Sequence, residues 1–390
     1  MKYRVSIQII VTLVVLGALS VVTAHAQAAK ETKVDCDKGD TINGAIAKLN
    51  RREPNFVLVS GTCTETVDVF NYNDLAIVGS PGAVLIPGPE FDEAVFVNVA
   101  YRFRFQGFTI NGSGASLGIS LFRCVNCVVS NNTINGVASG VSAISNSSVD
   151  VSNNRIFVSG QVTNGTAAGV GVAQVSRAIM TRNLIEHTGP PDGGSIGLHV
   201  SGNSHARVNV GSTFRGFGRG IEAGTGGAIA VFGTLSLTDP DFPLIENNQE
   251  AGARSEGGTL WFHGHTRLTG NGGRNPYSGG IVIDNGGALN LANLVEVINN
   301  TSNGVLLISN STGVFQGGIS ISNNQRNGIV VINSSTLELR SGFGPNTVSG
   351  NTAQDVFCDS NSLITGGSNI TGATKTMCAN LKAGKSDPIP

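Results

Sequence analysis

The chain has 390 residues, of which 53 are Gly and 38 are Asn, whereas charged residues make up 13% and hydrophobic residues 40%. Low charge with high apolar content excludes a disordered chain, and so much Gly and Asn excludes a helical protein. The formal net charge of −1 gives no electrostatic attraction to nucleic acid, so we expect no nucleic-acid partner. The composition predicts many short strands separated by turns.

The N-terminus has the pattern of an export signal. A basic start precedes an apolar run over 5–22, and Ala24-His25-Ala26 supplies the small residues that a signal peptidase recognises. We expect a signal peptide over 1–26, cleaved before Gln27, and a mature chain with no membrane span. Its destination would be extracellular, the cell surface or the periplasm. The alternative is an uncleaved membrane anchor, because the run is close to the length that spans a bilayer.

Six cysteines fit the oxidising compartment that export implies. Four of them flank one short segment at each end of the chain, and we expect each pair to form a disulfide worth roughly 2–4 kcal/mol. These pairs are Cys36 with Cys63 and Cys358 with Cys378. Cys124 and Cys127 form a C-x-x-C, but no second such motif and no nearby His supports redox or metal chemistry. We interpret them as a buried structural pair that packs as small hydrophobes.

An internal repeat dominates the middle of the chain. A Gly followed by alternating apolar residues recurs every 22 to 32 residues, and fourteen residues after the first three glycines stand Asn132, Asn154 and Asn183. A further apolar strand lies between the Gly and the Asn. The glycines are Gly118, Gly140, Gly169, Gly197, Gly220, Gly280, Gly304 and Gly328, with a weaker member at Gly252.

Each block therefore predicts three short strands and no helix. No block can bury its apolar face alone, so the blocks must stack, and a period of this length with three strands is typical of a parallel β-helix. The recurring Asn at one turn suits stacking of side-chain amides between coils. The fold class that we expect is an all-β, single-stranded parallel β-helix of about 12 coils.

The sequence resembles the right-handed parallel β-helix superfamily with the pectate-lyase-like fold, in particular its secreted β-helix-repeat proteins. The resemblance extends over 34–381 and includes Val34-Asp-Cys36, the segment 41–49, Val57-Leu-Val-Ser-Gly-Thr-Cys63 and Leu75-Ala-Ile-Val-Gly79. It implies one domain over 27–390. The domain would have a helix over 41–49 that caps the first coils (34–93), repeats over 94–350 and a disulfide-pinned C-terminal cap over 351–381.

The resemblance predicts the fold but not a chemical activity, because this superfamily includes enzymes, adhesins and scaffolds. Its polygalacturonases share N-T-D, D-D, G-H-G and R-I-K motifs, its pectate lyases an aspartate cluster for calcium and a W-x-D-H-like strand, and its alginate epimerases a D-P-H-E. None of these occurs here. Calcium would enter only if the chain were a lyase, and otherwise we expect no cofactor and no metal.

One group of titratable residues falls at outward positions of the Gly-x-x-x strands in the middle coils. The tentative catalytic cluster consists of His199, Glu222, Arg254, Glu256 and Asp284. Neighbouring coils lie about 4.8 Å apart, so these groups would be within reach of one another and could supply an acid and a base for cleaving a glycosidic bond. The alternative is a solvated strand face with weak ion pairs. The register at Gly252 is uncertain by one residue, because its turn comes early.

A second group lies on the next strand. In Leu260-Trp-Phe-His-Gly-His-Thr-Arg-Leu268, alternation turns Trp261, His263, His265 and Arg267 outward. An outward Trp beside cationic groups predicts a stacking platform for a sugar, including an acidic one. The alternatives are that neighbouring loops cover the Trp, or that His-x-His binds a metal, which the absence of a nearby carboxylate or Cys disfavours.

Three long turns accompany these groups. They occur over 186–194, 239–243 and 271–277, and insertions in solenoids often build the binding face. We therefore expect an exported protein that binds a polysaccharide or a cell-surface glycan, or that serves as an adhesive scaffold. The alternative is a polysaccharide lyase or glycoside hydrolase that uses the middle-coil carboxylates. A metal-handling protein is disfavoured by three Met and scattered His.

Overall fold

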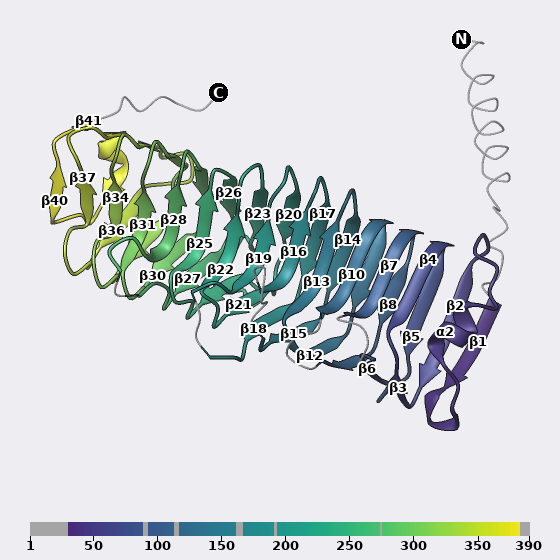
Figure 1. Cartoon of the computed structure of the whole chain (residues 1–390). Helices are drawn as coiled ribbons and strands as arrows, with labels where there is room; N and C mark the ends of the chain where they lie inside the picture. The colour runs from purple at the N-terminus through teal and green to yellow at the C-terminus, as the bar shows by residue number, and fades with distance from the viewer. Residues whose placement is uncertain are drawn as a thin grey trace, which may run out of the picture.

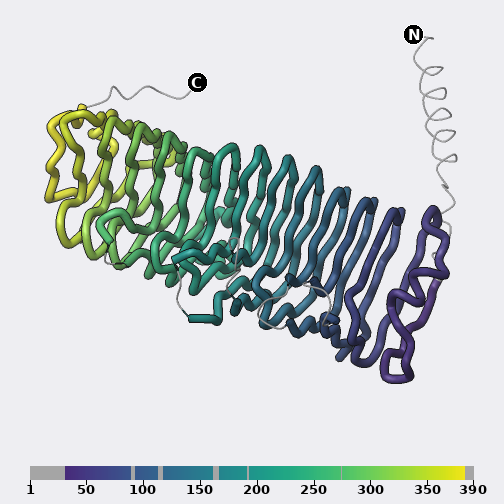
Figure 2. The backbone as a smooth tube through the Cα atoms, in the orientation of Figure 1, coloured from purple at the N-terminus to yellow at the C-terminus, as the bar shows by residue number. Residues whose placement is uncertain are grey.

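The computed structural model describes residues 30–88, 93–112, 117–160, 167–190, 193–273 and 275–382. They form a right-handed parallel β-helix, as expected, and its coils stack side by side in chain order from β1 to β41 (Figure 1). The tube in Figure 2 shows the same succession of coils. The expected signal peptide over 1–26 lies outside the described residues, as do Pro191, Asp192 and Arg274 of the expected long turns. No helix of the described segments is long and apolar enough to cross a membrane.

Sheet A contains fifteen parallel strands. They are β1 (Lys30–Asp35), β2 (Asn55–Ser60), β5 (Leu75–Gly79), β8 (Arg104–Gln106), β11 (Cys127–Ser130), β14 (Ser148–Ser152), β17 (Arg177–Thr181), β20 (His205–Val208), β23 (Ala228–Phe232), β26 (Thr259–His263), β29 (Ala288–Ala292), β32 (Thr312–Phe315), β35 (Thr336–Leu339), β38 (Leu363–Thr365) and β41 (Leu381–Lys382).

Sheet B contains thirteen parallel strands, each of which follows a strand of sheet A along the chain. They are β3 (Thr62–Thr64), β6 (Val84–Ile86), β9 (Thr109–Asn111), β12 (Thr133–Val137), β15 (Arg155–Val158), β18 (Leu184–His187), β21 (Thr213–Arg215), β24 (Leu244–Glu246), β27 (Thr266–Thr269), β30 (Val295–Ile298), β33 (Ser320–Ser322), β36 (Asn346–Ser349) and β39 (Ile370–Thr371).

Sheet C contains thirteen parallel strands and includes the repeated Gly-x-x-x segments. They are β4 (Val67–Asn73), β7 (Glu93–Tyr101), β10 (Leu117–Val125), β13 (Ser139–Ile144), β16 (Ala168–Ala173), β19 (Ile196–Val200), β22 (Arg219–Ala223), β25 (Ala251–Glu256), β28 (Gly279–Asp284), β31 (Asn303–Leu307), β34 (Ile329–Val331), β37 (Val356–Cys358) and β40 (Thr376–Cys378). The coil count is thus close to the expected 12.

The interior of the three sheets is one continuous apolar core that runs from Val34 to Ile364. Alternate residues of each strand point into it, as β23 shows with buried Ile229 and Val231 between three partly exposed residues. All strands pair in parallel, so every coil buries its inner face only against the coils before and after it.

Two ladders of buried Asn side chains join the coils, one at the turn between sheets A and B and the other at the turn between sheets B and C. The residue before each of these Asn has a positive φ, as at Asn131, Asn153 and Asn299, which directs the amide inward. Asn132 donates to Asn154 at 3.1 Å and Asn154 donates to Asn183 at 3.1 Å, so the expected amide stacking is confirmed.

The first ladder ends at Ser212, whose hydroxyl oxygen accepts the backbone N–H of Asn183. The second ladder lies at the turn between sheets B and C and runs through Asn248, Asn271, Asn300, Asn324 and Asn351. Asp355 terminates it by accepting the amide of Asn351 at 3.0 Å. Burial raises the pKa of this carboxyl group, but the backbone N–H of Thr374 and the Asn351 side chain outweigh burial and hold the pKa below its ordinary value.

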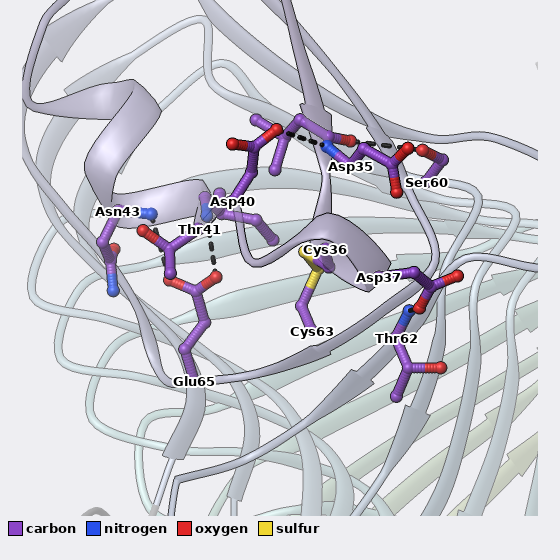
Figure 3. The surroundings of a disulfide bond; sticks show 12 residues. Asp35, Cys36, Asp37, Asp40, Thr41, Asn43, Ser60, Thr62, Cys63 and Glu65 are labelled. Carbon is purple, nitrogen blue, oxygen red and sulfur yellow. Dashed lines mark hydrogen bonds between the residues drawn. A yellow bond between two sulfur atoms is a disulfide. The ribbon is translucent and has the colours of Figure 1, made fainter.

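The N-terminal end is held by a disulfide, the Glu65 carboxylate and the Thr41 hydroxyl group (Figure 3). Cys36 and Cys63 are bonded, as expected. The Glu65 carboxylate accepts the backbone N–H groups of Ile42 and Asn43 at 2.7 and 3.0 Å, and Thr41 Oγ accepts that of Gly44 at 3.0 Å. These contacts cap α2, which covers only Ile42–Ile46 and follows the short 3₁₀ turn η1 (Cys36–Lys38). The capping helix expected over 41–49 is therefore not confirmed, because the chain turns after a single helical turn.

The C-terminal disulfide between Cys358 and Cys378 is also present, and η2 (Gly367–Asn369) lies between its two strands. Cys124 and Cys127 are a buried structural pair, as expected, and they are bonded to each other. Their Cα atoms lie 5.9 Å apart across the turn from sheet C to sheet A, a separation that a disulfide spans.

We predict that Asn271→Ala lowers the free energy of unfolding by on the order of 1–3 kcal/mol, because it leaves buried groups of the preceding coil without a partner. Asn271 Oδ1 accepts from Asn248 and its amide donates to the carbonyl of Ile245 at 2.9 Å. Urea denaturation followed by circular dichroism measures the change. The matched control is Asn135→Ala, whose solvent-exposed amide donates to Asn111 at 3.0 Å. Equal destabilisation by both variants would contradict the role of the ladder.

Candidate functional site

The first candidate site lies on the outer face of sheet C, where β19, β22, β25 and β28 are neighbours (Figure 1). The register aligns His199 with Glu222 and Glu222 with Arg254 in one column. Glu256 is aligned with Asp284 in the adjacent column. The structure thus brings all five residues of the expected cluster together, and β25 has no register slip at Gly252.

Two residues that sequence reasoning missed complete this cluster. Arg219 Nη1 lies 2.6 Å from Glu222 Oε2, and Arg219 Nε lies 2.9 Å from Glu250 Oε2. Arg219 immediately precedes Gly220 on the same strand. The sequence repeat was counted from the Gly onward, so Arg219 was left out of it. Its charge, three residues before Glu222, was the available signal.

Arg254 joins the two columns. Its Nη2 lies 3.4 Å from Glu256 Oε2 and 3.5 Å from Asp284 Oδ2. Glu222 is only 6% exposed although it points outward, because Arg219 and its neighbours on the sheet cover it. The cluster therefore contains four carboxylates and two guanidinium groups, and every carboxylate has an Arg partner.

Two shallow pockets flank the Arg254–Glu256 pair. One has a volume of ≈ 330 Å³ and is lined by Arg219, Glu250, Arg254, Tyr277, Asp284 and apolar residues that include Val282 and Ile308. The other has a volume of ≈ 480 Å³ and is lined by His199, Ser201, Gly202, Gly224, Thr225 and Glu256. Tyr277, on the expected long turn over 271–277, lies at the edge of the first pocket and is 59% exposed.

The pKa of His199 lies below its ordinary value. Burial is the main cause, the positive charge of Arg219 adds to it, and the negative charge of Glu222 opposes it. The neutral imidazole is therefore favoured. Protonation favours the unfolded chain, so the stability that His199 contributes is complete above its ordinary pKa of 6.5 and is lost as the pH falls through the lowered value.

The chemistry that this arrangement favours is charge pairing. An acid–base pair needs two carboxyl groups in different environments. Here Glu222 is bonded to Arg219, and Arg254 binds both Glu256 and Asp284. The catalytic role of the cluster stays a prediction.

The second candidate site lies on the outer face of sheet A. Trp261 is 41% exposed, so no loop among the described residues buries it. Its ring lies 5.4 Å from the ring of Phe232 in an edge-to-face arrangement and 6.4 Å from that of His263. The ring of Phe343 lies 6.0 Å from that of His263 and is also exposed. We call Phe232, Trp261, His263 and Phe343 the aromatic face.

Small neighbours leave the indole accessible. Trp261 is flanked in register by Ala230 on β23 and by Asn290 on β29. Phe343 reaches the aromatic face from the turn after β35, three coils beyond β26. The turn folds back over Gly317, which has a φ of 106° and where a Cβ would meet the carbonyl oxygen of Gly344. Only glycine therefore allows this approach.

The expectation that His265 and Arg267 share the face of Trp261 is wrong. The strand ends at His263, and Gly264, with a φ of 80°, turns the chain toward sheet B. His265 is fully buried, with its ring nitrogens 3.0 Å from Glu296 Oε2 and 3.2 Å from the carbonyl of Ser236. Arg267 lies on β27 and is paired with Glu296 at 2.8 Å.

These contacts also remove His-x-His as a metal site. The ring of Phe242, from the turn after β23, lies 4.1 Å from that of His265 and covers it. In the described segments, the one group of side chains close enough to hold a metal is Cys36, Cys63 and Glu65. The two sulfur atoms of that group form a disulfide, so they are not thiolate ligands.

Comparisons with known proteins find similarity in fold alone. No family model matches the chain, and no curated protein sequence matches it. Among solved structures, the chain is similar to an alginate lyase from Paenibacillus sp. str. FPU-7 (12% identity, TM-score 0.35, covering 92% of this chain and 99% of that one). It is also similar to the Azotobacter vinelandii mannuronan C-5 epimerase AlgE6 A-module (12% identity, TM-score 0.45, 90% and 95%). A third is PfbA, a surface adhesin of Streptococcus pneumoniae (12% identity, TM-score 0.39, 92% and 93%). Likeness at this level says nothing about function.

We predict opposite shifts of the His199 pKa in two variants. Glu222→Gln lowers it further, because the negative charge that favours the imidazolium is removed, and Arg219→Gln raises it, because the opposing positive charge is removed. Titration of the imidazole resonances by NMR measures both values. Shifts of the same sign in the two variants would contradict the geometry of the cluster.

Proposed function

We propose that the chain is a non-catalytic protein that binds polysaccharide through the aromatic face of sheet A. The observation that carries the proposal is the exposed Trp261 with Phe232, His263 and Phe343 around it. A sugar ring has an apolar face that stacks on an indole, and clustered aromatic side chains offer several such contacts on a rigid sheet. An exposed aromatic cluster of this kind has no packing role that explains it.

Polar groups beside the rings supply the hydrogen bonds that a sugar needs. Gln316 donates to Asn290 at 3.1 Å, so these two amides are held together next to Trp261. Arg207 lies on the opposite side, with its guanidinium group 4.3 Å from the centre of the Phe232 ring. A glycan that lies across the strands would meet amides, rings and a cation in succession.

A lyase or hydrolase that uses the sheet C cluster is the competing function. The two pockets beside Arg254 favour it, because a cleft is where a substrate would bind. The ion pairs argue against a catalytic role. A general acid must carry a proton that it can donate, whereas Glu222, Glu256 and Asp284 are each paired with an arginine. We therefore place glycan binding on sheet A. The three disulfides are consistent with an exported protein that works outside the reducing cytosol.

We predict that Trp261→Ala weakens binding to the preferred polysaccharide about tenfold, because loss of a stacked ring costs on the order of 1 kcal/mol or more. Affinity electrophoresis in gels that contain one polysaccharide each, acidic or neutral, measures the retardation of the mature chain. The matched control is Tyr277→Ala, which removes a similarly exposed aromatic side chain beside the sheet C pocket.

Two results would overturn the proposal. One is unchanged retardation of Trp261→Ala together with a loss in Tyr277→Ala, which would move binding to sheet C. The other is release of oligosaccharides from any polysaccharide of the panel, with or without calcium, that Glu222→Gln or Glu256→Gln abolishes. That second result would establish an enzyme.

A further inference from the structure

Arg207 is the one residue beside the aromatic face with an uncompensated positive charge held in a fixed orientation. Its Nε donates to Asn209 Oδ1 at 2.8 Å, and its guanidinium plane lies against Phe232. No carboxylate within the described ranges pairs with it. Seven other arginines have such a partner, namely Arg102, Arg182, Arg215, Arg219, Arg254, Arg267 and Arg340.

Between Asp150 on β14 and Glu338 on β35, the strands of sheet A around Arg207 carry no acidic residue. These consecutive strands are β17, β20, β23, β26, β29 and β32. They contain Arg177, His205, Arg207 and His263, and Arg177 is in register with His205. Sheet C, in contrast, has four carboxylates against two guanidinium groups in the middle coils. A chain of net charge −1 thus leaves an excess of positive charge on the face that contains Trp261.

We propose that the aromatic face selects polysaccharides with carboxylated sugars, and that Arg207 binds the sugar carboxylate. This inference rests on the proposed function, because it concerns the same face. The Nε of Arg207 is occupied by Asn209, and stacking on Phe232 fixes the plane. The two terminal nitrogens then present parallel N–H groups to a planar carboxylate, which is the bidentate geometry that arginine favours.

The spacing fits one ligand that contacts both groups. Arg207 is in register with Ala230, and Ala230 with Trp261, so Arg207 and Trp261 lie two strands apart, roughly 10 Å across the sheet. Ala230 stands between them in the register, and the ring of Phe232 lies against both side chains. A uronate chain lying across the strands would place one ring on Trp261 and the carboxylate of a neighbouring ring on Arg207.

The experiment compares a polyuronate with the same polymer after chemical reduction of its carboxyl groups. Isothermal titration of the mature chain at low salt measures both affinities. We expect the wild-type chain to prefer the polyuronate, and Arg207→Gln to lose about tenfold in affinity for it while its affinity for the reduced polymer is unchanged. Arg155→Gln is the matched control, because the Arg155 guanidinium group lies 5.6 Å from the centre of the Phe157 ring on sheet B and pairs with no carboxylate of the described residues. It removes the same charge and should keep the preference.

Each other outcome has a definite meaning. Equal losses in Arg207→Gln and Arg155→Gln would show a nonspecific charge effect and overturn the inference. Equal wild-type binding of the acidic and the reduced polymer, unaffected by Arg207→Gln but weakened by Trp261→Ala, would overturn the inference and leave the proposed function standing. Binding of a sulfated polymer of the same charge density as tightly as the polyuronate would overturn the commitment to carboxylate. If the wild-type chain binds neither polymer and Trp261→Ala changes neither result, the proposed function itself is contradicted.

Discussion

Buried amides in the middle coils set the register on which the outer surface depends. Inside each ladder an Asn accepts the backbone N–H of the Asn in the previous coil and donates to the next one, as Asn271 does between Asn248 and Asn300. A slip of one residue would bring the Asn out of the core and every inward apolar side chain to the surface. The ladders therefore determine which residues appear side by side on the outer faces of sheets A and C, including Trp261 and Glu222.

The repeat could be predicted from the sequence because contacts between neighbouring coils require particular residues at fixed positions. Glycines at one position and Asn132, Asn154 and Asn183 at another reflect close backbone approach and the amide ladder, so strand order, register and the sheet C cluster followed from spacing alone. Gly118, for example, tolerates no Cβ because it would meet the carbonyl of Gly140 in the next coil. Glu222, Arg254, Glu256 and Asp284 meet as expected for the same reason.

The positions of side chains that depend on the path of a turn could not be predicted in this way. Gly264 was read as a strand residue, and its left-handed conformation moves His265 into a buried pocket that Phe242 covers. Phe343 reaches His263 from three coils away only because the turn after β35 folds back over Gly317, and no local pattern indicates that path. Arg207 is separated from Trp261 by more than 50 residues in the sequence, so its place beside the aromatic face follows from stacking of the coils and not from a motif.

The outer faces of sheets A and C differ in how their charged side chains are paired. Sheet C pairs its carboxylates with Arg219 and Arg254, which neutralises them locally, whereas sheet A exposes rings and an unpaired guanidinium group. Trp261 is the only Trp of the chain, so its fluorescence reports on the aromatic face alone. The most direct measurement is therefore a titration of the wild-type protein with oligosaccharides of the polymer that it binds, followed by tryptophan emission. The account predicts a saturable change in emission with the same dissociation constant that calorimetry gives. Calorimetric binding with no change in emission would contradict it, because the ligand would then bind away from Trp261.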